Sequence, residues 1–472
     1  MEKIIGRTFE YQQLDQCIKS SRSEFVIICG RRRVGKTFLI RSYFNDTYDF
    51  RYTGTRNMSQ RVQLDKFAEA LQHYSKSKFR PVLKDWYDAF TQLQNILDDL
   101  PKDKRKIIFI DEMPWIDSPK SVFVNALECF WNTWANMRDD IVLIACGSAT
   151  SWMNDKLIDN QGGLHNRITR KIFLHPFTLN ETKEYLRDKK CHWNTYQIIQ
   201  AYMILGGVPF YYSLLDPKNS LVKNIDYLFF DNGGVLNGEF NELYHALFAN
   251  SDKYINVVRA LSQKREGLNR SEIIQETKLS GGGLSKILEN LEKCDFIKGY
   301  TKFGNPAKNT IYKLTDFYTL FYFRFLENGS GDDDEFWTHN CTSPKIYSWQ
   351  GYTFELVCLK HVRQIKKKLG ISGMATSVSC WRSHSTGDNT QIDLLIDRAD
   401  RTINVCEIKF ASSPYTIDKA YENRLLMRNA IFTSETKTTK ALTITFISVH
   451  GLIPNVHSQI VDSEVTGEDL ME

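Results

Sequence analysis

One octapeptide limits the possible folds of this chain more than any other feature of its sequence. Residues 30–37 read Gly-Arg-Arg-Arg-Val-Gly-Lys-Thr, which matches the pattern G-x4-G-K-[ST]. An apolar run at residues 25–29 precedes the octapeptide, and residues 38–40 open a second apolar run. A buried strand, a glycine-rich loop and a helix in this order predict a phosphate-binding loop, because the loop amides and the positive end of the helix point at one anion.

The residue types in this loop indicate a nucleoside triphosphate as the ligand. Lys36 can supply positive charge to the β and γ phosphates, and Thr37 can offer its hydroxyl to Mg²⁺. We therefore expect the chain to bind ATP together with Mg²⁺. The predicted nucleotide-binding residues are Gly30, Arg31, Arg32, Arg33, Val34, Gly35, Lys36, Thr37 and Phe38.

A pair of carboxylates follows another apolar run, at residues 107–110. Asp111 ends this run, and a carboxylate at the end of a neighbouring strand can hold Mg²⁺ directly or through water. Glu112 comes next and can polarise the water that attacks the γ-phosphate. Thr37 and Asp111 are thus the predicted metal ligands, and Lys36 and Glu112 the predicted catalytic residues.

Two further assignments in the first third of the chain stay open between a functional and a structural role. Ser148 follows the apolar run at residues 141–146, where a γ-phosphate sensor would lie, although a plain helix cap explains it as well. Arg167 and Arg170 can stabilise transition-state charge as an arginine finger. Solvated surface arginines are the alternative.

The bulk composition indicates a multidomain globular protein. At 472 residues the chain exceeds one hydrophobic core, and no apolar run approaches the roughly 20 residues that cross a bilayer. With no secretory signal pattern at the N-terminus, we expect a cytoplasmic protein without membrane contact. Ten cysteines without CxxC spacing predict no zinc site. The net charge of +5 permits nucleic-acid binding without demanding it.

Periodicity divides the chain into segments of different character. Short apolar runs alternate with amphipathic segments in the first third, which predicts an α/β core with a parallel sheet. Helical patterns then replace strands, and a helix, short helix, turn, helix and hairpin order follows, typical of a winged helix-turn-helix. The predicted segments are a core at 1–175, a helical lid at 176–236, a winged helix at 237–327, an exposed linker at 328–342 and an α/β domain at 343–472.

The winged-helix segment contains a candidate DNA-reading helix. Ser280 is a suitable N-cap for a helix whose apolar residues share one face. Lys302 and Lys308 of the hairpin can meet phosphates, whereas Glu289 would oppose them. The outward residues are expected to be Ser285, Lys286, Glu289, Asn290 and Lys293. Contact with double-stranded DNA and packing against other domains both remain open.

The last segment carries an ordered set of charged residues. The strand-like runs 391–396 and 403–409 are joined by a turn and predict a hairpin. Alternation places Glu407 and Lys409 on one face, and Asp393 can reach that face from the paired strand. Two carboxylates there, Asp393 and Glu407, can hold Mg²⁺ while the lysine orients or activates a water, which is the chemistry of phosphodiester hydrolysis.

The first half of the chain resembles the archaeal-type ATPases, on the STAND and AAA+ side of the P-loop proteins. The resemblance rests on Ile5-Gly6-Arg7 with Glu10 and Leu14, Gly30 to Thr37, Asp111-Glu112, Gly147-Ser148, Arg167, and Leu205-Gly206-Gly207-Val208-Pro209. It extends through the winged helix. It implies that Arg7 and Pro209 contact the adenine side of the nucleotide, and that the turn before Pro209 belongs to the lid.

The last segment resembles the PD-(D/E)xK nuclease fold, which commonly ends the chain in that family. The resemblance implies Glu355 as the first motif residue, followed by Asp393, Glu407 and Lys409, all four as catalytic residues. Because a fold does not imply its activity, this domain either cleaves DNA or only binds.

Three functions remain open on this basis. The first is an ATP-hydrolysing switch that controls a DNA-directed, nuclease-like domain. The second is an ATP-gated DNA-binding protein or scaffold with a catalytically silent last domain. The third is an NTPase that acts on a protein partner. A homo-oligomer is compatible with each of them.

Overall fold

The computed structural model folds into two compact units. It describes residues 4–101, 103–118, 121–148, 150–158, 162–164, 166–231, 233–248, 250–304, 310–329, 333–383 and 390–472, with the backbone alone at Thr150 and Ser151. The first unit comprises residues 1–175 and 243–251, and the second comprises residues 176–242 and 252–472. Within the described part of the chain, no helix is long and apolar enough to span a bilayer.

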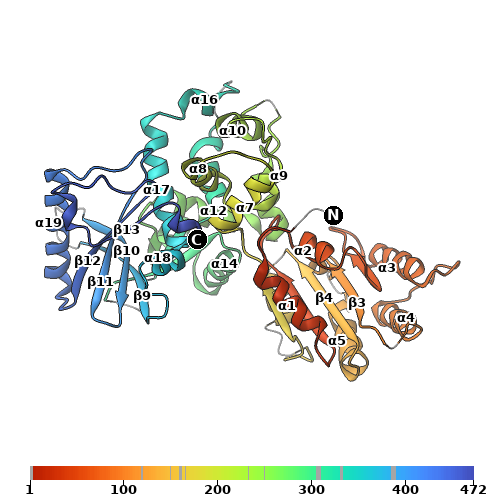
Figure 1. Ribbon diagram of the computed structural model, residues 1–472. Helices are drawn as coiled ribbons and strands as arrows, with labels where there is room; N and C mark the ends of the chain where they lie inside the picture. Colours follow the sequence, from red (N-terminus) through yellow and green to blue (C-terminus); the bar gives the residue numbers. More distant parts are fainter. Residues whose placement is uncertain are drawn as a thin grey trace. The chain divides into compact units, whose positions relative to one another are not determined.

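The first unit is built on a parallel five-stranded sheet in the order β2-β3-β4-β1-β5, flanked by helices (Figure 1). Its strands are β1 (Glu24–Cys29), β2 (Phe50–Thr53), β3 (Lys106–Asp111), β4 (Ile141–Gly147) and β5 (Arg170–Phe173). Its helices are α1 (Thr8–Ile18), α2 (Lys36–Tyr43), α3 (Gln60–Ser75), α4 (Trp86–Asp98), α5 (Phe123–Thr133) and α6 (Thr150–Met153). The predicted α/β class and the parallel core are confirmed.

Alternation along the strands divides the core of this unit into two layers. Phe25 and Ile27 of β1 join the aromatic side chains of α3, α4 and α5, whereas Val26 and Ile28 join α1 and α2. Every residue of β1 is buried. A strand that is covered on both faces is apolar along most of its length, and this explains why residues 25–29 of β1 read as an uninterrupted apolar run.

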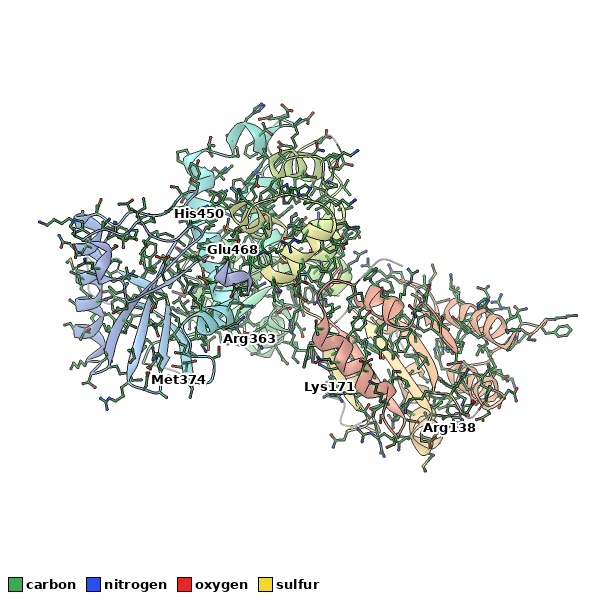
Figure 2. The ribbon with its side chains drawn as sticks, viewed as in Figure 1. Arg138, Lys171, Arg363, Met374, His450 and Glu468 are labelled. Atoms are coloured by element: carbon green, nitrogen blue, oxygen red, sulfur yellow. The ribbon has the colours of Figure 1, made fainter. Side chains whose placement is uncertain are left out.

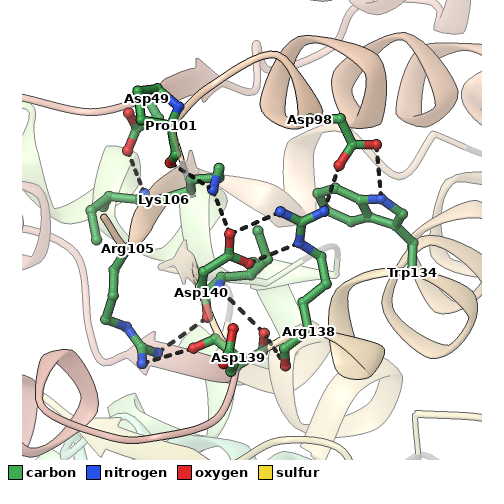
Figure 3. Close-up of polar contacts among 12 residues, drawn as sticks. Asp49, Asp98, Pro101, Arg105, Lys106, Trp134, Arg138, Asp139 and Asp140 are labelled. Atoms are coloured by element: carbon green, nitrogen blue, oxygen red, sulfur yellow. Dashed lines mark hydrogen bonds and ion pairs between the residues drawn. The ribbon is translucent and has the colours of Figure 1, made fainter. Parts of the chain in front are cut away.

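A buried network of charges closes the amino-terminal edge of this sheet (Figure 3). Lys106, the first residue of β3, pairs with Asp140, which immediately precedes β4. Arg138 donates Nε to Asp140 Oδ1 at 2.8 Å and lies with its guanidinium carbon 4.6 Å from the centroid of the Trp134 ring. Arg105 donates to main-chain carbonyls, including Arg22 O at 2.8 Å. These contacts hold the starts of β3 and β4 together.

The second unit begins with helices that pack around aromatic side chains. Its helices are α7 (Leu179–Asp188), α8 (Thr195–Leu205), α9 (Pro209–Ser213), α10 (Leu221–Phe229), α12 (Ser251–Ser262), α13 (Arg270–Thr277), α14 (Gly281–Lys293), α15 (Phe317–Phe321), α16 (Phe336–Asn340), α17 (Pro344–Lys360), α18 (Val362–Lys368) and α19 (Lys419–Thr436), while α11 (Glu239–Leu247) runs from this unit into the first. The turn at Gly207 is packed tightly, since a Cβ there would lie 1.9 Å from Phe177 O. Phe177 N in turn donates to Gly207 O at 2.6 Å.

One eight-stranded sheet runs through the second unit, in the order β13-β12-β11-β10-β9-β7-β8-β6. Its strands are β6 (Leu268–Asn269), β7 (Ile297–Lys302), β8 (Ile311–Leu314), β9 (Thr376–Arg382), β10 (Gln391–Arg398), β11 (Thr402–Lys409), β12 (Ala441–Ser448) and β13 (Ser463–Val465). The hairpin predicted from residues 391–409 is present as the antiparallel pair β10–β11.

The sheet joins two segments that the sequence analysis treats as separate domains. Strand β7 of the predicted winged helix pairs in parallel with β9, where Thr301 is opposite Ser379 and Lys302 is opposite Cys380. Phe303 N also donates to Cys380 O at 3.0 Å. Two edge strands satisfy each other's backbone groups in this way, so the hairpin and the last segment share one sheet.

The second part of the predicted exposed linker over residues 328–342 contains a short helix with one buried side chain. Helix α16 occupies residues 336–340, and Trp337 is buried. Asp226 of α10 accepts hydrogen bonds from Trp337 N at 2.7 Å and from Thr338 N at 3.0 Å. A polar composition is compatible with either solvent or such a cap, and here a buried carboxylate caps the helix. Residues 330–332 of this segment lie outside the described residues.

The last segment packs against the helices that open the second unit. Glu468, labelled in Figure 2, accepts a hydrogen bond from Lys183 of α7 at 2.6 Å. His361, at the end of α17, accepts from Leu179 N through Nε2 at 3.1 Å and contacts Val357 O through Nδ1 at 2.8 Å. Burial lowers the pKa of His361 to about 4, so the ring is neutral and joins α17 to the start of α7.

Candidate functional site

Three polar segments meet at the carboxyl edge of the parallel sheet. Strands β1 and β4 are in register with Cys29 opposite Gly147, and β3 and β4 are in register with Ile110 opposite Ala145. The loop that follows β1, the carboxylates that end β3 and Ser148 after β4 therefore emerge at the same edge. Ligands of open parallel sheets bind at this edge, because the loops that follow the strands converge there.

The backbone of the 30–37 loop requires its glycines. Gly30 has φ of 148°, and a Cβ at this position would lie 2.2 Å from Leu174 O. Gly35 has φ of 92° and precedes α2. Left-handed backbone and close approach are both accessible to glycine, which explains the two fixed glycines of the pattern.

Lys36 is buried at the first position of α2. Its Nζ donates to Gly30 O at 3.0 Å and to Arg31 O at 2.9 Å. Only 5% of the residue is exposed. These partners are neutral carbonyls of the loop itself. They hold the ammonium at the loop without neutralising it, so its charge is available to an anion bound there.

Thr37 and Asp111 are in direct contact. The Thr37 hydroxyl donates to Asp111 Oδ2 at 2.9 Å, and Asp111 is buried. Asp111 Oδ1 accepts from Glu112 N at 3.0 Å, which fixes the plane of the carboxylate. A hydroxyl and a carboxylate on adjacent segments form an oxygen donor set suited to Mg²⁺, so the residues at this position fit the metal.

Glu112 points toward Ser148 at the end of β4. Ser148 Oγ donates to Glu112 Oε1 at 2.9 Å, and Ser148 N lies 3.4 Å from Oε2. Burial raises the pKa of Glu112, and the neighbouring Asp111 charge adds to this effect, whereas Lys36 and the Ser148 hydrogen bonds oppose it. A raised pKa is what a general base near neutral pH requires.

Arg7 braces the phosphate-binding loop from outside. The residue has φ of 57°, is buried, and donates NH2 to Val34 O at 3.1 Å. Glu10 lies 3.9 Å from Arg7 NH1. The contact is with the loop backbone, and the adenine-side role of Arg7 stays a prediction.

Arg167 lies away from this group. It is exposed and precedes β5, whose first residue, Arg170, is opposite Val26 of β1. Val26 is four residues before Gly30, about 13 Å along the strand. The structure therefore does not bring Arg167 to the phosphate-binding loop of its own chain. Pro209 begins α9 in the second unit, and its predicted adenine contact stays a prediction.

The four residues predicted from the last segment come together in the second unit. Glu355 lies on α17, Asp393 on β10, and Glu407 and Lys409 on β11. The charges of Asp393, Lys409 and Glu407 all act on Glu355. Burial, followed by the neighbouring Asp393 carboxylate, raises the pKa of Glu355 above its usual range, and the opposing charges of Lys313 and Lys409 do not outweigh these two effects.

Glu407 is paired with cations on both carboxylate oxygens. Lys409 Nζ lies 3.0 Å from Oε1, Tyr421 OH donates to the same oxygen, and Arg428 binds Oε2. Burial favours a higher pKa, but Arg428 and Lys409 outweigh it and hold the pKa of Glu407 at about 2. The carboxylate is therefore ionised and already neutralised by protein cations.

The donor set around Asp393 and Glu407 does not fit the predicted Mg²⁺. Asp393 Oδ1 lies 3.6 Å from the ammonium of Lys313, a buried lysine on β8. Among the described residues, no group of three or more histidine, cysteine, aspartate and glutamate side chains is arranged to hold a metal ion. A divalent ion between these carboxylates would have to displace protein cations from them.

The sequence analysis did not predict three residues that contact these carboxylates, namely Lys313, Tyr421 and Arg428. Lys313 stands between Tyr312 and Leu314 in a short strand of another segment, and no local pattern connects it with Asp393. Tyr421 and Arg428 are seven residues apart on α19, a spacing that places them on one helix face. That shared face is the only sequence signal that could have indicated them.

The candidate DNA-reading helix, α14, is partly as predicted. Ser280 precedes it but makes no side-chain cap, and Ser285, Lys286 and Glu289 are exposed. The expected outward position of Asn290 is wrong, because this residue is buried and donates to Tyr254 OH at 2.9 Å. Residues 305–309, including Lys308, lie outside the described residues.

Comparison with known proteins shows what residues 5–215 are similar to. Residues 5–215 match the family described as an ATPase domain predominantly from Archaea. An uncharacterized protein, MJECL04 of Methanocaldococcus jannaschii, is 23% identical over 382 residues, which cover 77% of this chain and 78% of that protein. Within residues 5–215, the expected archaeal-type P-loop ATPase domain is confirmed.

Two solved structures are similar to this chain at lower sequence identity. The Walker-type ATPase Paby2304 of Pyrococcus abyssi is 21% identical, with 68% of this chain and 96% of that chain covered and a TM-score of 0.48. The ORC2 protein of Aeropyrum pernix, in ADPNP and ADP complexes, is 11% identical, with 72% and 96% covered and a TM-score of 0.41.

Proposed function

We propose, from the premise that residues 5–215 form an archaeal-type P-loop ATPase domain, that this chain binds Mg-ATP and hydrolyses it. One observation carries the proposal. Lys36 is buried against the carbonyls of its own loop, while Thr37 and Asp111 form a joint oxygen donor set beside it. Together the ammonium, the loop amides and one Mg²⁺ can neutralise the charge of a triphosphate.

The remaining residues at this edge have separate roles in the proposed reaction. Mg²⁺, held by Thr37 and by Asp111 directly or through water, supplies charge neutralisation on the phosphates. Glu112 orients the attacking water, and Ser148, which hydrogen-bonds to Glu112, positions that carboxylate and senses the γ-phosphate. Arg167 can reach a γ-phosphate only from a second copy of the chain, which is why we retain a homo-oligomer in the proposal.

A short stretch of chain, anchored by hydrogen bonds at both ends, supports the idea that nucleotide state is transmitted to the second unit. Leu174 N donates to Cys29 O at 2.8 Å, and Leu174 O lies directly against Gly30. Five residues further along the chain, Leu179 N is bound by His361 at the end of α17. Glu355 lies on the same helix. We infer that a displacement of the loop at Gly30 can be passed along residues 174–179 to α17, which carries Glu355.

The second unit favours an ATP-gated DNA-binding protein or scaffold over an active nuclease. Glu407 is bound by Lys409, Tyr421 and Arg428, which leaves no carboxylate oxygen without a protein partner. We therefore propose a C-terminal domain that binds without cutting. The DNA contact would be made by the exposed face of α14 and by Lys302, in a winged-helix arrangement.

The proposal is tested by measuring Mg-ATP binding and turnover on the full chain, with and without double-stranded DNA. We expect saturable binding of Mg-ATP and a turnover rate that changes when DNA is added. DNA affinity should fall as salt is raised, because phosphate contacts release counterions. If Mg-ATP fails to bind to folded protein, the ATPase proposal is wrong. ATP turnover without DNA binding even at low salt would favour an NTPase that acts on a protein partner.

A further inference from the structure

The C-terminal cluster contains as many protein cations as carboxylates. Glu355, Asp393 and Glu407 are the three carboxylates, and Lys313, Lys409 and Arg428 are the three cations. Five elements supply them: α17, β10, β11, β8 and α19. We propose that Lys313, from the β7–β8 hairpin, takes the place of a divalent cation in this cluster, so that the hairpin keeps the cluster free of metal.

The position of Lys313 is the first argument. The side chain is 3% exposed, and its Nζ lies 3.6 Å from Asp393 Oδ1. Its charge also acts on Glu355. A lysine with a long aliphatic stem is rarely buried unless its ammonium is paired, so the burial of Lys313 depends on these carboxylates.

The sheet that presents Lys313 is the second argument. Strand β8 pairs with β7, with Lys313 opposite Lys298, and β7 pairs with β9. Strand β9 then pairs with β10, which carries Asp393. The pairings of β8 with β7, of β7 with β9 and of β9 with β10 fix the backbone that carries Lys313 relative to the strand that carries Asp393.

Glu407 supplies the third argument, because it is occupied independently of the hairpin. Arg428 of α19 binds one of its carboxylate oxygens, and Lys409 and Tyr421 bind the other. With Asp393 neutralised by Lys313, a divalent ion that entered would meet ammonium and guanidinium charges in a buried surrounding, where like charges repel strongly. Removal of Lys313 leaves Asp393 and Glu355, whose charges interact, without that cation, and carboxylate oxygens are the ligands that Mg²⁺ and Mn²⁺ prefer.

The test is a titration of the full chain with Mn²⁺ in the absence of nucleotide, in which the electron paramagnetic resonance signal of free Mn²⁺ reports binding. The wild type should bind no Mn²⁺ that depends on Asp393, so the wild type and Asp393→Asn should give the same curve. Lys313→Met should gain one site at least about tenfold tighter than any wild-type binding, because a repelling charge is removed. Lys313→Met combined with Asp393→Asn should lose that site again.

A matched control exists on the same strand. Lys440 pairs with Asp397 at the far end of β10, so Lys440→Met removes a more exposed lysine–aspartate pair on the same strand and should gain no site. Mn²⁺ binding by the wild type that Asp393→Asn abolishes would overturn the proposal, and so would a folded Lys313→Met that binds no more than Lys440→Met. If Lys313→Met does not fold, the comparison of the wild type with Asp393→Asn still decides. ATP turnover, measured in parallel, separates this result from the ATPase proposal.

Discussion

The two edges of the parallel sheet in the first unit each bury a lysine, but they use it differently. At the amino edge Lys106 pairs with the carboxylate of Asp140, which Arg138 also binds (Figure 3). At the carboxyl edge Lys36 donates to two backbone carbonyls, while the nearby carboxylates bond to hydroxyls instead. The first lysine is neutralised within the fold, and the second keeps its charge available to a ligand.

This difference separates a structural charge from a functional one. Removing a partner from a neutralised pair costs folding free energy, because it leaves a buried charge behind. Removing a charge whose counter-charge arrives with the ligand costs binding instead. By the same criterion the C-terminal cluster, in which every carboxylate faces a protein cation, resembles the Lys106 edge more than the Lys36 edge.

The largest effect should come from Lys36→Ala, the change that would break the comparison most directly. We expect Mg-ATP affinity to fall by about 2–5 kcal/mol or more, which abolishes detectable turnover, since a buried charge contact to phosphate is lost. The thermal midpoint should hardly change. Calorimetric titration and thermal melting measure the two quantities. Lys171→Ala, which changes an exposed lysine on β5, is the control and should leave both unchanged.

Glu112→Gln tests whether Glu112 acts as the base at the carboxyl edge. The amide can still accept the hydrogen bond from Ser148, so nucleotide binding should persist. Turnover should fall by about 10²–10⁴-fold, as expected when a general base is removed. Steady-state phosphate release and ATP titration check the two parts. Glu69→Gln, at an exposed site, is the control. Unchanged turnover in Glu112→Gln would exclude this residue as the base.

Asp140→Asn should affect stability and leave nucleotide affinity intact. It leaves Lys106 buried without its counter-charge, so we expect a loss of about 3–5 kcal/mol in the free energy of unfolding. Denaturant titration measures it. Asp139→Asn, at the adjacent exposed residue, should have little effect. A weakened ATP affinity in folded Asp140→Asn would contradict the division between the two edges.

The smallest predicted effect is a dependence of the free energy of unfolding on pH, which arises from the Asp140 carboxylate. Arg138 is the main cause that lowers the pKa of Asp140, with Lys106 adding to it against the opposing effect of burial. A lowered folded-state pKa means that the stabilisation is complete above the unfolded pKa of about 4 and is lost as pH falls toward the folded value. The wild type should therefore lose more stability than Asp140→Asn between neutral and acid pH.

Local patterns predicted three strands of the first unit, β1, β3 and β4, and the helix α2 that follows the phosphate-binding loop. The octapeptide and its flanking apolar runs located β1, the loop and α2, and the run that ends in Asp111 located β3. These predictions succeed because the glycine spacing of the loop and the apolar character of each strand can be read from consecutive residues. The differences from prediction concern residues whose partners lie far along the chain. Asn290 donates a hydrogen bond to Tyr254 OH, and the backbone N–H of the buried Trp337 donates to the carboxylate of Asp226.

The sequence by itself determined the phosphate-binding loop, its lysine and threonine, and the two carboxylates that follow β3, since each depends on short spacing next to a strand. Only the tertiary structure decided what surrounds the C-terminal carboxylates. Lys313 and Arg428 reach Asp393 and Glu407 from other elements. Spacing along a chain carries the local backbone geometry, whereas the neutralisation of a buried charge depends on which distant cations the fold brings to it.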